Sequence, residues 1–185
     1  MKQNSVPSSG LSPEGQFKLT SLIIPIYLPS LIIFLGWGMI IPIIPLFAKE
    51  LGAGLGLASI VVSIHGFGIL LADIPGGAFP DRFGEKATAV LAISGTALSA
   101  FFIGLFRDLS ILIVMVFIFG AFRAFFFLSV QTYVKRKAPV HMRGRSLALI
   151  GGMMRIGMFL GPIAGGFIGK LLGMHTVFLS MAFLT

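Results

Sequence analysis

The sequence predicts an all-α integral membrane protein, and two observations carry that prediction. Of the 185 residues, 56% are apolar and only 11% are charged, a composition unlike that of soluble domains. The apolar residues form long unbroken stretches rather than alternating or heptad faces, so a bilayer solvates them better than a single globular core would. The absence of cysteine excludes disulfides, thiolate metal sites and cysteine nucleophiles.

The gaps between charged residues divide the chain into six spans. A bilayer core of about 30 Å is crossed by roughly 20 helical residues. On this basis we expect spans at about 19–48, 54–79, 87–106, 109–134, 146–169 and 174–185. The last stretch reaches Thr185 without a polar stop, so we expect a fragment that ends inside a sixth helix. Residues 1–18 are polar and rich in Ser, Pro and Gly, which is typical of a short disordered cytoplasmic lead rather than a cleaved signal.

The distribution of Lys and Arg between the spans predicts the orientation. Residues 1–18, 80–86 and 135–145 hold nine of these residues, whereas the alternate loops hold only three, Lys49, Arg107 and Lys170. Basic residues are retained on the cytoplasmic side. We therefore expect a multi-pass plasma-membrane protein with a cytoplasmic amino terminus, and we attribute its net charge of +8 to topology rather than to a nucleic-acid partner.

The cytoplasmic turn between the second and third spans reads GAFPDRFGEK and carries four charges. Gly77 and Gly84 are expected where φ turns positive or where backbones approach closely. Asp81 is expected to cap or attract a helix amino terminus, while Arg82 and Lys86 meet anionic headgroups. Judged by charge alone, an ordinary solvated loop with topological charges is the better explanation of the segment.

The order of these residues resembles a known signature. Gly77, Asp81, Arg82, Gly84 and Lys86 follow the pattern between the second and third helices of the major facilitator superfamily, except that Glu85 occupies the first of its two basic positions. The resemblance implies a conformational switch, because in that family the turn holds two six-helix halves together in one state of the transport cycle.

The fifth span contains a second match, GMFLGPIAGG. Its residues Gly157, Gly161, Pro162, Gly165 and Gly166 resemble the glycine and proline motif of the antiporter branch, especially of drug and proton exchangers. Gly157, Gly161, Gly165 and Gly169 recur every four residues, which predicts a smooth helix face for close packing, and Pro162 adds a kink. Generic small-residue packing is the alternative interpretation.

Two further segments and one arginine extend the resemblance. LGWGMIIPIIP in the first span is similar to the pattern of twelve-helix drug exporters, and APVHMRGRS resembles the start of the fifth helix, with Arg143 and Arg145 as membrane-surface anchors. Arg123 lies where the family often has an arginine implicated in proton transfer, although Phe126 and Phe127 replace the usual Gln and Gly. The resemblance implies the amino-terminal six-helix half of a twelve-helix major facilitator fold, truncated within helix six.

Four ionisable residues lie inside the predicted spans: His65, Asp73, Arg123 and Arg155. Charges in hydrocarbon are costly and are functional candidates by default. Helix geometry places Asp73 and both arginines at similar depths, about 10 to 16 Å from the cytoplasmic face. We expect Asp73 to pair with Arg123 or Arg155, either as a substrate and proton coupling site or as a structural ion pair. His65 is expected to make a helix-packing hydrogen bond.

The predicted function is secondary active transport by alternating access, with proton-coupled export of small organic molecules. An uptake symporter or uniporter and a non-transporting structural subunit are the alternatives. The sequence contains no GxSxG or HExxH motif, so we do not expect an enzyme. The expected partners are the lipid bilayer, a small-molecule substrate, protons and a missing carboxy-terminal half, with no cofactor, metal or nucleic acid. The substrate, the coupling ion and the direction of transport stay open.

Overall fold

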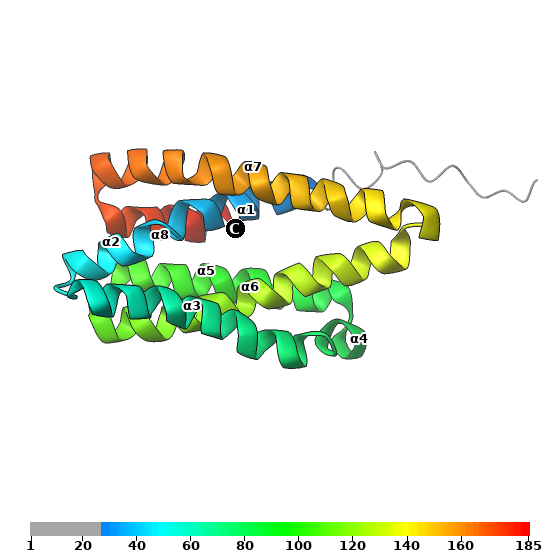
Figure 1. The fold of residues 1–185 in the computed structure, drawn as a ribbon, viewed down its shortest axis with the longest axis horizontal. Coiled ribbons are helices and arrows are strands. Elements are labelled where there is room, and N and C mark those ends of the chain that lie inside the picture. Colours follow the sequence, from blue (N-terminus) through cyan, green and yellow to red (C-terminus); the bar gives the residue numbers. More distant parts are fainter. Residues whose placement is uncertain (1–26) are drawn as a thin grey trace, which may run out of the picture.

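The computed structural model describes residues 27–185, which form helices and no strands (Figure 1). The polar lead predicted over residues 1–18 and the first part of the predicted span 19–48 lie outside the described residues. Five helical segments are long and apolar enough to cross a membrane, so the predicted all-α membrane fold is confirmed. The helices are α1 (Leu28–Ile40), α2 (Ile43–Glu50), α3 (Leu55–Gly76), α4 (Phe79–Phe83), α5 (Glu85–Leu105), α6 (Leu109–Lys137), α7 (Val140–Leu172) and α8 (Met174–Leu184).

Helices α1 and α2 form one apolar span that is interrupted at Ile41 and Pro42. Proline has no N–H, so Pro42 and Pro45 remove the donors that would bond to the carbonyls four residues earlier. Such breaks are tolerated in a membrane where neighbouring helices enclose the freed backbone groups. Here α1 is the most enclosed of the five spans, since α7 and α8 both pack against it.

The basic segment 135–145 is helical for most of its length, so the prediction of a loop there is wrong. Helix α6 continues to Lys137, α7 begins at Val140, and only Ala138 and Pro139 separate them. Ala138 is extended, as expected for a residue before proline. The side chain of Arg143 donates to the carbonyl oxygen of Ala138 at 3.2 Å. Charges mark where a span leaves the hydrocarbon, but a helix does not have to end there.

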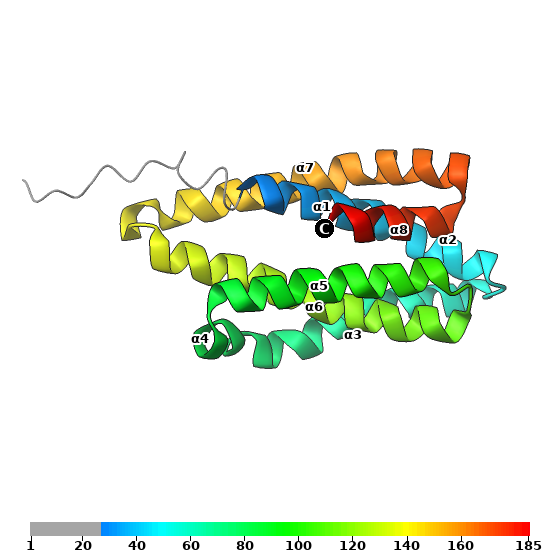
Figure 2. The same ribbon diagram turned by 180° about the vertical axis from the view of Figure 1, so that it is seen from behind.

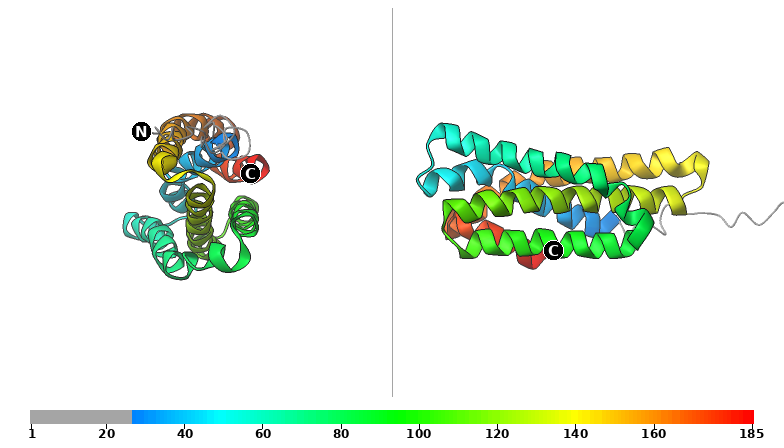
Figure 3. Two further views of the ribbon diagram at one scale, coloured as in Figure 1. Left: turned by 90° about the vertical axis from the view of Figure 1, so that its right-hand side faces the viewer. Right: turned by 90° about the horizontal axis from the view of Figure 1, so that it is seen from below.

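The helices are arranged in two layers that run roughly side by side. One layer contains α1, α7 and α8, and the other contains α3, α5 and α6 (Figure 3). Helix α6 is the centre of the second layer, because α3 and α5 both pack along it. Seen from behind, α5 and α8 lie nearest the viewer, and their contact joins the layers (Figure 2).

Aromatic side chains form the core where the two layers meet. Phe34 and Trp37 of α1 meet Phe126 of α6 edge to face, with the Trp37 and Phe126 ring centres 5.5 Å apart. At the other end, the rings of Phe47 and Phe178 lie 5.2 Å apart. Edge-on aromatic pairs contribute roughly 0.5–1.5 kcal/mol each beyond their burial. These contacts set how closely α1 and α6 approach each other.

Helix α6 starts at a defined cap. The Asp108 carboxylate accepts hydrogen bonds from the backbone N–H groups of Ser110 at 2.8 Å and Ile111 at 3.1 Å. These donors have no partner within the helix, so an acidic cap stabilises its first turn by about 1 kcal/mol. The neighbouring Arg107 lies 3.0 Å from Nδ1 of His175, which ties this end of α6 to the start of α8.

Candidate functional site

The charged turn after α3 folds into the short helix α4 and reverses at Gly84. Gly84 has φ +86°, a conformation that favours glycine, and α5 begins at the next residue. The same expectation is wrong for Gly77, whose φ is −64° and whose added Cβ would meet nothing within 4 Å. A single glycine therefore makes the reversal, and it brings Asp81 and Glu85 to the same side of the turn.

Arg136, in the last turn of α6, joins the two acids of this turn. One guanidinium nitrogen donates to Asp81 at 2.9 Å and another donates to Glu85 at 2.8 Å. The Glu85 side chain is the more enclosed, at 18% exposed against 69% for Asp81. Asp81 makes no capping bond, so the capping alternative is wrong, although the residue does lie in the first turn of α4. We call Asp81, Glu85 and Arg136 the turn clamp, since they fasten α4 and α5 to α6.

The glycines of the fifth span let α7 lie directly on the backbone of α1. A Cβ added to Gly157 would come within 2.6 Å of the Phe34 backbone, and one on Gly161 within 2.5 Å of Gly38. Gly165 meets Met39 at 2.8 Å in the same way. No side chain fits in these gaps, so glycine is required at all three positions. The predicted close-packing face is confirmed for these three residues.

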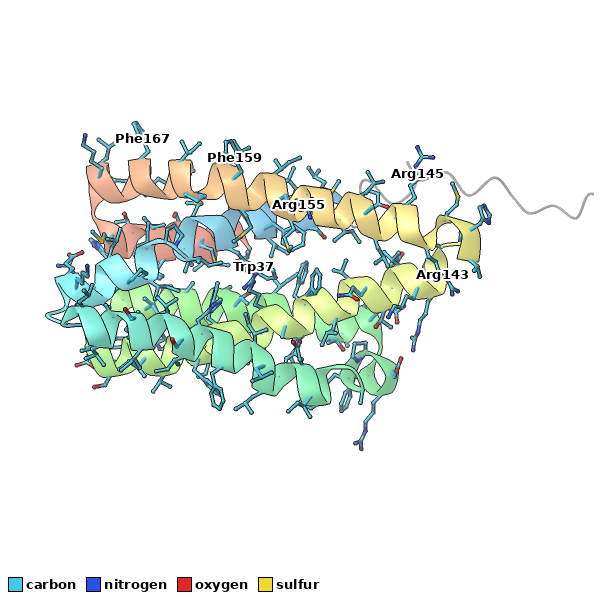
Figure 4. All side chains as sticks on the ribbon, viewed as in Figure 1. Trp37, Arg143, Arg145, Arg155, Phe159 and Phe167 are labelled. Carbon is cyan, nitrogen blue, oxygen red and sulfur yellow. The ribbon has the colours of Figure 1, made fainter. Side chains whose placement is uncertain are left out.

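Three other residues of the motif region do not belong to this face. Gly166 is exposed with nothing within 4 Å of an added Cβ, and Pro162 is also exposed. Gly169 has ordinary contacts of 3.5 Å or more, so it does not require glycine. On the same outer side, Phe159 and Phe167 point away from the bundle (Figure 4). Gly166 and Pro162 therefore lie on the outer surface of α7 and are not part of its contact with α1.

A second glycine crossing joins α3 and α6. The backbone of Gly68 lies against the carbonyl of Phe117, and Gly120 lies against the carbonyl of His65. Each helix contributes one glycine, so the two backbones approach reciprocally. Neither residue could be singled out from the sequence, because two isolated glycines in different spans give no local pattern.

The predicted ion pair of Asp73 is wrong. In residues 27–185 the ion pairs are those of Arg136, and Asp73 makes none with Arg123 or Arg155. Asp73 is exposed on α3, and Arg155 is exposed near the middle of α7 (Figure 4). Similar depth along the membrane normal does not place two residues on facing sides of their helices. Both side chains project from the bundle instead of joining its spans.

Arg123 lies against an aromatic ring rather than an acid. Its guanidinium carbon is 5.1 Å from the centre of the Trp37 ring, in the region where α1 and α6 meet. Trp37 is buried, and its Nε1 has no hydrogen-bond partner among the described residues. A cation over a desolvated indole gains about 2 kcal/mol. In the described residues Arg123 has no acidic partner, and the Trp37 ring stabilises its charge instead.

His65 also differs from expectation, and it packs against an aromatic ring of α6. The Nε2 of His65 is buried without a hydrogen-bond partner in the described residues, and its ring lies 5.8 Å from the Phe119 ring. Phe126 is 3% exposed, in the aromatic core, and Phe125 stacks on Phe79 at 5.0 Å. Phe125 and Phe126 therefore pack within the bundle.

Comparison with known proteins identifies the family of this bundle. The family model described as "Major Facilitator Superfamily" matches residues 26–185, which is most of the chain. The chain belongs to the major facilitator superfamily. Over 135 residues it is 30% identical to "Multidrug resistance protein 2" of Bacillus subtilis (strain 168), which covers 73% of this chain and 34% of that protein. Over 145 residues it is 24% identical to "Quinolone resistance protein NorA" of Staphylococcus aureus (strain MRSA252), which covers 78% of this chain and 37% of that protein.

The alignments thus span about a third of the length of these relatives. In the major facilitator superfamily, each six-helix half contains two inverted three-span repeats. The two glycine crossings agree with this arrangement, because α1 with α7 joins spans one and five, and α6 with α3 joins spans four and two. Under the repeat, these two pairs are equivalent.

The turn clamp also explains how this member departs from the family signature. Glu85 stands where the signature has a basic residue, and the helix end facing it supplies Arg136. The acid on α5 therefore has a base on α6 as its partner. Behind the clamp, a hollow of about 250 Å³ opens between α1, α5 and α6, and Glu85, Ser30, Ser129 and Tyr133 are among its polar lining residues.

Proposed function

We propose that this chain is the amino-terminal half of a secondary active transporter that exports small organic molecules in exchange for protons. The proposal rests on the α7 glycine face, which follows the antiporter-type motif and packs directly on α1. The printed names of two relatives, a multidrug resistance protein and a quinolone resistance protein, favour export of drug-like compounds. The superfamily consists of transporters, which argues against an enzyme.

The glycine crossings make two rigid helix pairs that move as units. Backbone contact without intervening side chains leaves little room for sliding of α7 on α1 or of α3 on α6. Alternating access in such folds is largely rigid-body rocking of one half against the other around a midplane site. The glycine residues of α7 therefore serve the transport cycle by keeping α1 and α7 together.

The turn with Gly77, Asp81, Arg82, Gly84 and Lys86 is the proposed conformational switch. Asp81 is largely exposed and shares Arg136 with the more enclosed Glu85. Glu85 keeps Arg136 in place even when Asp81 turns away. Asp81 is then the group that exchanges Arg136 for a partner on the other half of the transporter.

The proposed coupling residues are Asp73, Arg123 and Arg155. Asp73 and Arg155 are exposed on α3 and α7, which are the least enclosed of the long spans. A carboxylate within a span that has no cation beside it is costly in hydrocarbon and is a candidate proton carrier. Arg123, held on Trp37, retains free donor groups for a substrate acceptor or for an acid on the missing carboxy-terminal half.

The proposed setting is the plasma membrane, with the amino terminus in the cytoplasm. The turn clamp and the α6–α7 connection then lie on the cytoplasmic side, where basic residues are retained. The short connections Gly77–Gly84 and Ala138–Pro139 reach this same side. The bilayer surrounds the apolar outer surfaces of the bundle.

Gradient-driven flux tests the proposal. The intact protein is expressed in a bacterial host, and everted membrane vesicles receive a pH gradient with an acidic interior. A fluorescent quinolone and a fluorescent cationic dye serve as probes. Export coupled to protons predicts accumulation inside the vesicles that collapses when the gradient is dissipated. Equilibration without dependence on the gradient would support a uniporter, and the absence of flux across a broad substrate panel would contradict transport.

A further inference from the structure

A long groove runs between α5 and α6 on the outside of the bundle. It encloses about 650 Å³ and is lined by residues of these two helices alone. Its apolar walls include Ala87, Val90, Leu91 and Leu98 of α5 and Ile118 and Phe122 of α6. The polar residues along it are Lys86, Ser94 and Ser99. Figure 2 shows α5 in front of α6 in this layer.

The groove residues of α5 form one continuous stripe along a single face of the helix. Residues 87, 90, 91, 94 and 98 recur at spacings of three and four, so they lie on the same face. Val90 and Leu98 are 64% and 57% exposed, and no helix in the described part of the chain covers them. In a membrane protein such a surface meets acyl chains.

Lys86 supplies an unpaired cation at one end of this groove. It lies in the first turn of α5, is exposed, and makes no hydrogen bond or ion pair within residues 27–185. The adjacent Glu85 makes no ion pair with it and instead accepts from Arg136 at 2.8 Å. The groove therefore has an apolar floor and a positive charge where α5 leaves the hydrocarbon.

We propose that this groove binds an anionic phospholipid, with its phosphate on Lys86 and one acyl chain along α5. A leaflet is about half of the roughly 30 Å hydrocarbon core, so an acyl chain spans about ten helical residues at 1.5 Å each. Counted from Lys86, that length ends at Thr96, between Ser94 and Leu98 of the exposed α5 stripe. Basic groups beside a span attract anionic headgroups, which gives the site its selectivity.

Photolabelling of the intact protein tests this site. The protein is reconstituted in phosphatidylcholine vesicles with a trace of phosphatidylglycerol that carries a photoactivatable group midway along one acyl chain. Mass spectrometry then locates the label. We expect it to concentrate on residues 90–98 of α5 and 115–122 of α6. Lys86→Gln should lower this labelling about fivefold, and Ser94→Trp, which fills the groove, should abolish it.

Lys137→Gln is the matched control, since Lys137 is an exposed cation at the end of α6 outside the groove. Its labelling pattern should equal that of the unsubstituted protein. Equal labelling in Lys86→Gln, equal competition by unlabelled phosphatidylcholine and phosphatidylglycerol, or label spread evenly over α3 and α7 would each overturn the proposal. The readout is lipid contact, so it is independent of whether the protein transports any substrate.

Discussion

Arg136 of α6 donates to Glu85 of α5 across 2.8 Å, and the two residues are 51 positions apart in the chain. The contact joins two connections on the same side of the bundle. Glu85 begins α5 directly after the turn that contains α4, and Arg136 lies in the last turn of α6, just before the connection to α7. Asp81 shares the same guanidinium at 2.9 Å. Arg136 therefore binds two acids of this turn, of which Asp81 is largely exposed and Glu85 is mostly enclosed.

Reversing the charges of this pair separates a functional clamp from a surface ion pair. Arg136→Glu places a third carboxylate beside Asp81 and Glu85, and Glu85→Arg places a second cation beside Arg136. Each single change creates like-charge repulsion and should slow transport. The double change regains a 136–85 pair, although not the contact to Asp81, and should partly restore the rate. The expected coupling energy is about 1 kcal/mol, roughly fivefold in rate, from a double-mutant cycle on initial transport rates.

Lys137→Glu is the control for the clamp, because it reverses a neighbouring charge that has no ion pair in the described residues. Transport by this variant should equal that of the unsubstituted protein. Strict additivity of the two single reversals would show that Glu85 and Arg136 act independently.

Gly161→Ala should destabilise the bundle, whereas Gly166→Ala should not. The added methyl of Gly161→Ala would lie 2.5 Å from the Gly38 backbone, while nothing lies within 4 Å at Gly166. Overpacking of this kind costs about 1–3 kcal/mol. Thermal unfolding of the detergent-solubilised protein measures the difference, and equal melting temperatures for the two variants would contradict backbone contact between α1 and α7.

Trp37 should support Arg123 through its aromatic face. Trp37→Leu removes the ring and should lower transport toward the level of Arg123→Gln, while Trp37→Phe retains a weaker face and should lie between. In an Arg123→Gln background, Trp37→Leu should add little further loss. Full additivity of the two losses would mean that Trp37 acts only through packing with Phe34 and Phe126.

Asp73→Asn should uncouple transport from the pH gradient, because an amide cannot release a proton. Downhill movement of the probe should persist, while accumulation against a gradient should disappear. Asp108→Asn is the matched control, since asparagine caps a helix about as well as aspartate and Asp108 serves as the α6 cap. Gradient-driven accumulation that survives Asp73→Asn would remove Asp73 from the coupling site.

The sequence predicted what depends on local pattern. Long apolar runs predicted the membrane helices, and glycines at every fourth position of α7 predicted a close-packing face, although not that α1 would be its partner. Gly84 could be predicted too, because a tight reversal between two helices favours a residue that tolerates positive φ.

The predictions that were wrong concern contacts between residues of different helices, which depend on how the helices face one another. Asp73 was assigned an arginine partner from depth alone, but α3 turns that residue outward while its Gly68 side packs on α6. Arg136 was counted as one of nine topological charges, and nothing within the segment KRK distinguishes the residue that reaches Glu85. Trp37 lacked any signal as well, since its contact with Arg123 joins residues 86 positions apart along the chain.

Substrate-driven proton movement is the most direct test of the proposed exchange. The purified intact protein is reconstituted in liposomes that contain a pH-sensitive dye and an acidic interior, and the quinolone probe is added outside. Exchange predicts that the probe raises the internal pH, and that Asp73→Asn abolishes this rise. Entry of the probe without any change in internal pH would contradict proton-coupled export.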